Sequence, residues 1–131
     1  MRIILILKYN YQIMKDLHQK ALQAYLEMLQ IHINTKTSDL VFHEKTADFY
    51  EKLFEIAHQI GERYVDLDGQ LRDDSLESQK QRAHDIIKSL KNEIENYVES
   101  NTLTLGTDDL LGGLTDELED IQGTSKAFIK K

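Results

Sequence analysis

The chain has 131 residues, 40% hydrophobic and 30% charged, a composition that is ordinary for one globular domain and too apolar for a disordered chain. It contains no cysteine, which excludes disulfides, thiolate zinc sites, iron–sulfur clusters and thiol chemistry. The absence of proline and the presence of only six glycines predict long uninterrupted helices, and the formal net charge of −7 disfavours nucleic acid as a partner.

The segment 3–7 is a run of isoleucine and leucine that suits a strand or the start of a buried helix equally well. It is much shorter than the roughly 20 apolar residues that span a bilayer. It also lacks the longer apolar region and the cleavage site of a secretory signal, so we expect a cytoplasmic protein with no membrane partner. If the run is exposed in the monomer, it is a natural contact between subunits.

Apolar residues recur at intervals of three and four along four segments, which is the spacing of one helical face. The predicted helices cover residues 10–33, 40–67, 75–99 and 107–122, within a single domain 1–131. Four amphipathic helices with short connections predict an all-α four-helix bundle that is packed through its apolar stripes.

Polar residues mark the expected ends of these helices. Side chains of Ser, Thr and Asp can accept a hydrogen bond from a backbone amide in the first helical turn, so they favour the N-cap position. Residues 66–69 are expected to end the second helix and Gly123 the fourth. The expected N-caps of the second, third and fourth helices are Ser38 or Asp39, Asp74 with Glu77, and Thr107.

Histidines offer the clearest candidate chemistry. His58 and Glu62 are four residues apart and therefore adjacent on the second helix, where they can ligate one metal or form an ordinary solvated surface pair. His43 lies at a different end of the same helix, and His32 points with the apolar face of the first helix, as a core histidine or as a ligand. We expect His84 on a helix surface, and His18 receives no role.

The order of residues in the segments 32–45 (HINTKTSDLVFHEK), 58–63 (HQIGER) and 106–111 (GTDDLL) resembles a known family, the Dps proteins, which are dodecameric mini-ferritins of the ferritin superfamily. The first segment is similar to the family's His-Trp-Asn-Val-Lys-Gly running to its Leu-His-Glu, and the second to its Asp-Glu-Ile-Ala-Glu-Arg. The third is similar to the Gly-Thr-x-Asp-Leu-Leu at the start of the family's last helix. The resemblance implies a ferritin-like bundle.

In that family each iron-oxidising site lies between two subunits, which supply two histidines and an Asp with a Glu. The resemblance implies that His32 and His43 are the histidines and Glu62 the glutamate. His58 stands where the family has the Asp, and Ala47 where it has a further Asp one turn after the second histidine. The implied metal ligands are His32, His43, His58 and Glu62. Three imidazoles and one carboxylate carry less negative charge to stabilise Fe(III).

The resemblance therefore implies a homo-oligomer, a dodecamer if the family pattern holds, that binds iron and has a ferroxidase activity that is open to question. Two alternatives fit the same residues. The chain can be a ferritin-like interaction or structural protein without ferroxidase activity, or its ligands can hold zinc or another divalent metal in a structural site. The sequence supports no hydrolase, since it lacks a nucleophile elbow, a phosphate-binding glycine loop and a His-Glu-x-x-His motif.

Overall fold

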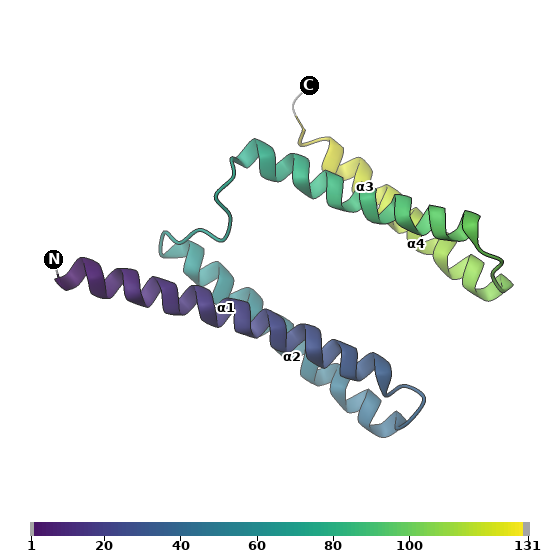
Figure 1. The fold of residues 1–131 in the computed structure, drawn as a ribbon, viewed down its shortest axis with the longest axis horizontal. Helices are drawn as coiled ribbons and strands as arrows, with labels where there is room; N and C mark the ends of the chain where they lie inside the picture. The colour runs from purple at the N-terminus through teal and green to yellow at the C-terminus, as the bar shows by residue number, and fades with distance from the viewer. Residues whose placement is uncertain (1, 130–131) are drawn as a thin grey trace. The chain divides into compact units, whose positions relative to one another are not determined.

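The computed structural model describes residues 2–129, with side chains from residue 12 onward. This part of the chain forms four α-helices and no strand, which confirms the predicted all-α class (Figure 1). The helices are α1 (Arg2–Asn34), α2 (Leu40–Asp66), α3 (Leu76–Ser100) and α4 (Leu105–Lys126).

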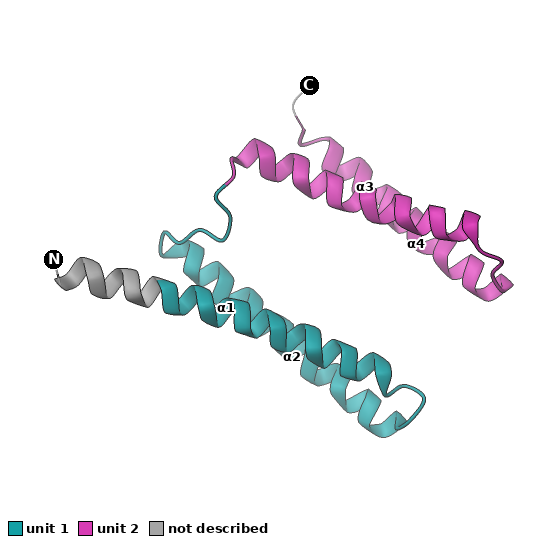
Figure 2. Cartoon of the chain, viewed as in Figure 1, with its two compact units in different colours: residues 1–73 teal, residues 74–131 magenta. Residues whose placement is uncertain are grey.

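The chain divides into two compact units, residues 1–73 and 74–131 (Figure 2). Each unit is a helical hairpin, in which α1 packs on α2 or α3 packs on α4. The predicted pairing of amphipathic helices is therefore present within each unit. The single domain 1–131 stays a prediction.

The first helix starts earlier than the sequence predicted. The apolar stripe placed its start near residue 10, whereas α1 begins at Arg2 and includes the isoleucine and leucine run. The side chains of that run, and with them its predicted role as a subunit contact, lie outside the described residues. Among the helices of the described part of the chain, none combines the length and the apolar character needed to cross a membrane.

The first hairpin is antiparallel, and three side-chain contacts set its register. The contacting residues step back by seven along α1 as they step forward by seven along α2, which is two helical turns each time. The contacting pairs are His32 with His43, Tyr25 with Tyr50, and His18 with Ala57. The buried residues of α2 are Thr46, Ala57, Gly61 and Tyr64, most of them small enough to let the two helices approach closely.

The N-cap of α2 is Asp39, one of the two residues predicted for it. Asp39 has an extended backbone, and its side chain accepts a hydrogen bond of 3.0 Å from the amide of Phe42. The cap of α3 differs from the prediction: the Ser75 hydroxyl accepts from the amide of Ser78 at 3.1 Å, one position after Asp74. Aspartate and serine are both good N-caps, so the cap is the residue whose backbone is extended at the start of the helix.

The fourth helix is longer than predicted at both ends. Its cap is Thr104, whose hydroxyl accepts from the amide of Thr107 at 3.3 Å, so Thr107 lies inside the first turn and is not the cap. At the other end the helix continues through Gly123 to Lys126. A glycine favours a helix end because it adopts left-handed backbone easily, but Gly123 does not adopt it.

The predicted end of α2 at residues 66–69 is confirmed. The residue with left-handed backbone is Asp68, one position before Gly69. Asp68 has φ 70°, and its amide donates to the Val65 carbonyl, while the Gly69 amide donates to the Tyr64 carbonyl at 2.9 Å. These two bonds form a Schellman motif. Gly69 is required for a different reason, since a Cβ atom there would lie 2.4 Å from the Tyr64 ring.

The second hairpin is also antiparallel and is joined by polar contacts between its helices. The Lys91 ammonium on α3 lies 3.1 Å from the Glu119 carboxylate on α4 and 3.4 Å from Glu95 on its own helix. Nearer the start of α3, His84 contacts Ser125 near the end of α4. The paired residues move in opposite directions along the two helices, as an antiparallel hairpin requires.

Candidate metal-binding site

Two of the predicted ligands meet at the closed end of the first hairpin. The His32 ring from α1 and the His43 ring from α2 are stacked, with centroids 3.9 Å apart and planes inclined by 16°. The Tyr50 ring flanks His32 at 5.0 Å. The two histidines are therefore held as one rigid pair.

Backbone carbonyls decide which nitrogen of each ring can bind a metal. His32 Nδ1 lies 2.7 Å from the His43 carbonyl oxygen, and His43 Nδ1 is bonded in turn to the His32 carbonyl oxygen. A carbonyl oxygen only accepts, so each Nδ1 carries the hydrogen and each neutral ring keeps its lone pair on Nε2. Buried Thr46 supports the pair, because its hydroxyl donates to the His43 carbonyl at 2.8 Å and lies 3.1 Å from His32 Nδ1.

The other two predicted ligands form a pair on the surface of α2. His58 Nε2 lies 2.6 Å from Glu62 Oε1, and the two side chains are 61% and 66% exposed. The Phe54 ring stacks on His58 with centroids 6.2 Å apart. The sequence prediction that these residues are adjacent is confirmed, and their exposure leaves them accessible to a metal or to another copy of the chain.

The four predicted ligands do not meet in one chain. His43 and His58 are fifteen positions apart on one straight helix, which separates their backbones by about 22 Å. Metal bonds to nitrogen or oxygen are only about 2.0–2.2 Å long, so one ion cannot join both pairs within one hairpin. In agreement, the described residues contain no group of three or more His, Asp or Glu arranged to hold a metal.

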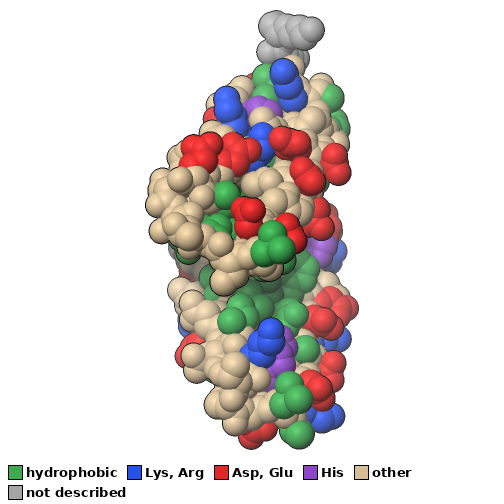
Figure 3. Space-filling model, turned by 90° about the vertical axis from the view of Figure 1, so that its right-hand side faces the viewer, with side chains coloured by type: hydrophobic (Ala, Val, Ile, Leu, Met, Phe, Trp, Pro, Cys, Tyr) green, Lys and Arg blue, Asp and Glu red, His purple; other side chains and the backbone are tan. Residues whose placement is uncertain are grey.

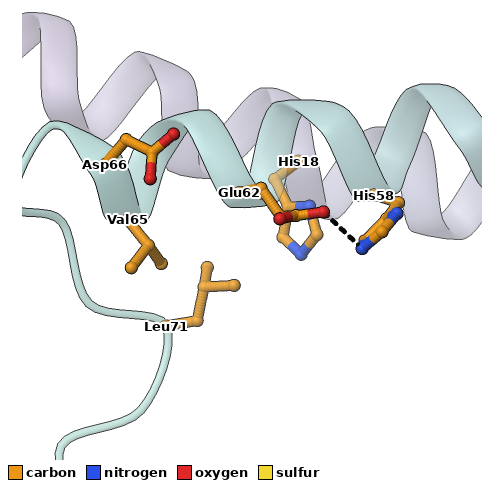
Figure 4. A pocket seen from close by; sticks show the side chains of 7 residues that line it. His18, His58, Glu62, Val65, Asp66 and Leu71 are labelled. Atoms are coloured by element: carbon orange, nitrogen blue, oxygen red, sulfur yellow. Dashed lines mark ion pairs between the residues drawn. The ribbon is translucent and has the colours of Figure 1, made fainter.

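A third histidine, for which no role was predicted, lies beside the His58–Glu62 pair. His18 from α1 donates through Nδ1 to the Ala57 carbonyl at 2.8 Å. Its ring lies in the same cavity as His58 and Glu62, which has a volume of about 280 Å³ (Figure 4). The remaining lining residues are Gly61, Val65, Asp66 and Leu71.

The sequence did contain a signal for His18. Counting back from His32 along the apolar face of α1, steps of three and four lead through Leu29, Tyr25 and Leu22 to His18. Its position on the packed face was therefore predictable. Its neighbours were not, because they depend on the register between α1 and α2.

The expectation for His84 was wrong. Only 8% of this residue is exposed, and its Nδ1 lies 2.8 Å from the Ser125 hydroxyl, which itself donates to the Gln122 carbonyl. The histidine is thus a bonded residue between α3 and α4. Its place on the inner face of the helix is hidden in the sequence, because the helical period there is marked by apolar residues and His84 is polar.

Comparison of the chain with models of protein families, with curated proteins and with solved structures gives no match in any of the three. The resemblance to the Dps proteins therefore stays a prediction that is carried by the residues quoted above. The geometry of the histidines and of Glu62 is the observation on which a function can be argued.

Proposed function

We propose that the chain is a metal-binding helical protein of the Dps type, which assembles with copies of itself and takes iron(II) as its substrate. The orientation of His32 and His43 carries this proposal, since both rings donate through Nδ1 and present Nε2 as a ligand atom. Metal-binding histidines are commonly held in this way, by a bond from the second ring nitrogen to a carbonyl or carboxylate. Helix packing alone does not require two stacked imidazoles.

A twofold pair of copies can complete the site. In a twofold pair, every contact between the copies occurs twice. If one residue of the first copy contacts another residue of the second copy, the same two residues also meet with the copies exchanged. The pair His32 and His43 of one copy can then face His58 and Glu62 of the other, and the same contact occurs twice. The separation of about 22 Å between the pairs within one hairpin becomes the separation of two equivalent sites.

The exposed apolar surface supports assembly. Among the described residues, the hydrophobic side chains that are buried are Ala57 and Tyr64 alone. Many large apolar side chains reach the surface instead, as Figure 3 shows on one face. In the first hairpin they include Leu26 at 54%, Phe54 at 51% and Val65 at 52% exposure. The two helices of each hairpin thus leave an apolar face that they do not cover themselves, and such a face is typical of surfaces that pack on another hairpin or bind another copy of the chain.

The donor set favours a borderline divalent metal. Three imidazoles and one carboxylate suit Fe2+ and Zn2+ alike. Oxidation of Fe(II) requires dioxygen or peroxide as the electron acceptor, and one carboxylate stabilises the Fe(III) product less than two would. We therefore expect ferroxidase activity that is slow for this class.

A structural zinc site between copies is the second candidate, because a ligand set of three histidines and one glutamate is equally suited to zinc. It differs from the first in one measurable property. A structural site binds zinc tightly and leaves added Fe(II) unoxidised, whereas a ferroxidase consumes oxidant in proportion to the iron supplied. An interaction protein without metal, which the exposed apolar surface also fits, binds neither ion.

Native mass spectrometry after anaerobic addition of Fe(II) tests the proposal, because one spectrum reports the number of subunits and the bound metal. We expect an oligomer that carries iron. Replacement of both His58 and Glu62 by alanine should remove the metal and leave the helical circular dichroism unchanged. The matched control is Glu55→Ala with Gln59→Ala, which removes a hydrogen-bonded pair of the same spacing on the same helix. A metal-free monomer would overturn the proposal.

A further inference from the structure

We infer that His18, together with His58 and Glu62, forms a site for one divalent transition metal within a single chain. Two imidazoles and one carboxylate are the donor set that holds Fe2+ in many non-haem oxygenases and Zn2+ in several hydrolases, with open positions for other ligands. The inference shares His58 and Glu62 with the proposed function. It differs in needing no second copy and in assigning a ligand role to His18.

The position of His18 is fixed for this task. Its Nδ1 donates to the Ala57 carbonyl, so the neutral ring keeps its lone pair on Nε2. Ala57 is fully buried, which gives the carbonyl a constant position in the hairpin. In Figure 4 the labelled His18 ring overlaps the Glu62 carboxylate, with His58 to one side, and all three side chains line the same cavity.

Gly61 is the second observation that points to His18. It lies in the middle of α2, where glycine weakens a helix relative to alanine. A Cβ atom at this position would lie 2.6 Å from His18 Cε1, 2.8 Å from its Nδ1 and 3.3 Å from its Nε2. The glycine therefore makes room for the imidazole to lie across the helix, at a position where helix formation alone favours alanine.

The His58–Glu62 pair is already close to the geometry of two ligands. Two donors about 2.1 Å from one metal are separated by about 3.0 Å at an octahedral angle and about 3.4 Å at a tetrahedral angle. The observed distance between His58 Nε2 and Glu62 Oε1 is 2.6 Å, so the pair has to open by about 0.4–0.8 Å. Metal entry displaces the proton that lies between the two atoms, and in the neutral ring this proton moves from Nε2 to Nδ1 as the tautomer changes.

The three donors are not converged on one point in the structure, where the described residues hold no group of three. The rearrangement falls on the two exposed side chains, since His58 and Glu62 are 61% and 66% exposed and turn in solvent. His18 stays bonded to the backbone. Asp66 lines the same cavity one turn after Glu62 and adds negative charge that attracts a cation.

Zinc titration of the purified chain tests the inference, with affinity measured by calorimetry and with ring-nitrogen NMR of the histidines. His18→Asn retains an amide donor near the Nδ1 position and removes Nε2. We expect it to lower zinc affinity by more than about tenfold, since even loss of a group that only orients a metal ligand costs that much. In the unchanged chain, zinc should shift the His18 Nε2 signal and leave its Nδ1 protonated.

Gly61→Ala provides a variant that alters no donor atom. Its added Cβ displaces the His18 ring, so zinc affinity should fall by about tenfold or more, as for other disturbed metal ligands. The matched control is Gly113→Ala on α4, where an added Cβ meets no atom within 4 Å. This control should bind zinc as the unchanged chain does.

The variant His32→Ala with His43→Ala separates this inference from the proposed function. If the single-chain site exists, this variant still binds zinc, and His18→Asn does not. Loss of zinc in both variants would overturn the single-chain site, because the metal then needs both pairs. Unchanged zinc affinity in His18→Asn, or no zinc binding by the unchanged chain, would overturn it as well. The proposed function fails separately, when removal of His32 and His43 changes neither iron binding nor assembly.

Discussion

Substitution of Gly61 by alanine should destabilise the chain when residue 18 is histidine and stabilise it when His18 is replaced by alanine. In the unchanged chain the new Cβ would lie 2.6 Å from His18 Cε1, whereas carbon atoms pack at about 3.5–4.0 Å. The ring must therefore retreat by about 1 Å, which lengthens its 2.8 Å bond to the Ala57 carbonyl beyond hydrogen-bond range.

The magnitude follows from three contributions. The lost hydrogen bond costs about 1 kcal/mol, and forcing extra volume into a packed contact costs about 1–3 kcal/mol. Replacing glycine by alanine in a helix interior returns about 1 kcal/mol. We expect Gly61→Ala to lower the free energy of unfolding by about 1–3 kcal/mol in the unchanged chain. With His18→Ala the clash is absent, and the same substitution should raise stability by about 0.5–1 kcal/mol.

The assay is urea unfolding of the four chains of this double-mutant cycle, followed by circular dichroism at one fixed protein concentration, because assembly couples to stability. Gly113→Ala is the control and should raise stability by the same ~0.5–1 kcal/mol in both backgrounds, since its Cβ meets no atom within 4 Å. Equal effects of Gly61→Ala with and without His18 would refute the close approach of the imidazole to the helix. The single-chain site would then lose the support of Gly61.

Three further predictions concern other contacts. Asp68→Gly should raise the free energy of unfolding by about 1 kcal/mol in urea, because Asp68 holds a left-handed backbone with φ 70°. Thr46→Val, which keeps the shape and removes the buried hydroxyl, should lower it by about 1–3 kcal/mol and also weaken iron binding measured by native mass spectrometry. The hydrogen bond that Lys91 donates to Glu119, with the negative charges of Glu119 and Glu95, raises the pKa of Lys91 above the usual 10.5. Lys91→Met should therefore flatten the loss of stability measured between neutral and strongly alkaline pH.

The sign for Lys91 follows from proton linkage. A group whose pKa is raised on folding stabilises the native state fully below its unfolded pKa, and this contribution is lost as the pH rises through the folded pKa. The loss therefore lies above pH 10.5 and is absent from neutral solution. A chain carrying Lys91→Met that still loses stability as steeply in this alkaline range would contradict the role given to the contact between α3 and α4.

Periodicity was sufficient for the helices and insufficient for their ends. Apolar spacing located all four helices because burial of one face dominates helix stability in proteins. The ends depend on single hydrogen bonds, and neighbouring candidates such as Asp74 and Ser75 differ too little for the sequence to rank them. The start of α1 stayed open between helix and strand for another reason, since a continuous apolar run has no helical period.

The candidate site was predictable as pairs and not as a whole. Residues four apart on one helix are neighbours whatever the rest of the fold does, so His58 and Glu62 were found directly. The contact of His32 with His43 needed the turn between α1 and α2, and that of His18 with Gly61 needed the register along the hairpin. Neither the turn nor the register can be predicted from the residue pattern of a single helix.

The two hairpins differ in what their histidines do. In the first, His18, His32 and His43 donate through Nδ1 to backbone carbonyls. Such a hydrogen bond sets the tautomer of the ring and leaves Nε2 free of that carbonyl. In the second, His84 is bonded to a side chain and is only 8% exposed, so a metal has no access to it. The proposed metal chemistry therefore involves residues 1–73, and substitutions that change it should cluster on α1 and α2. Substitutions on α3 and α4 that preserve both folding and assembly should leave the metal bound per chain unchanged.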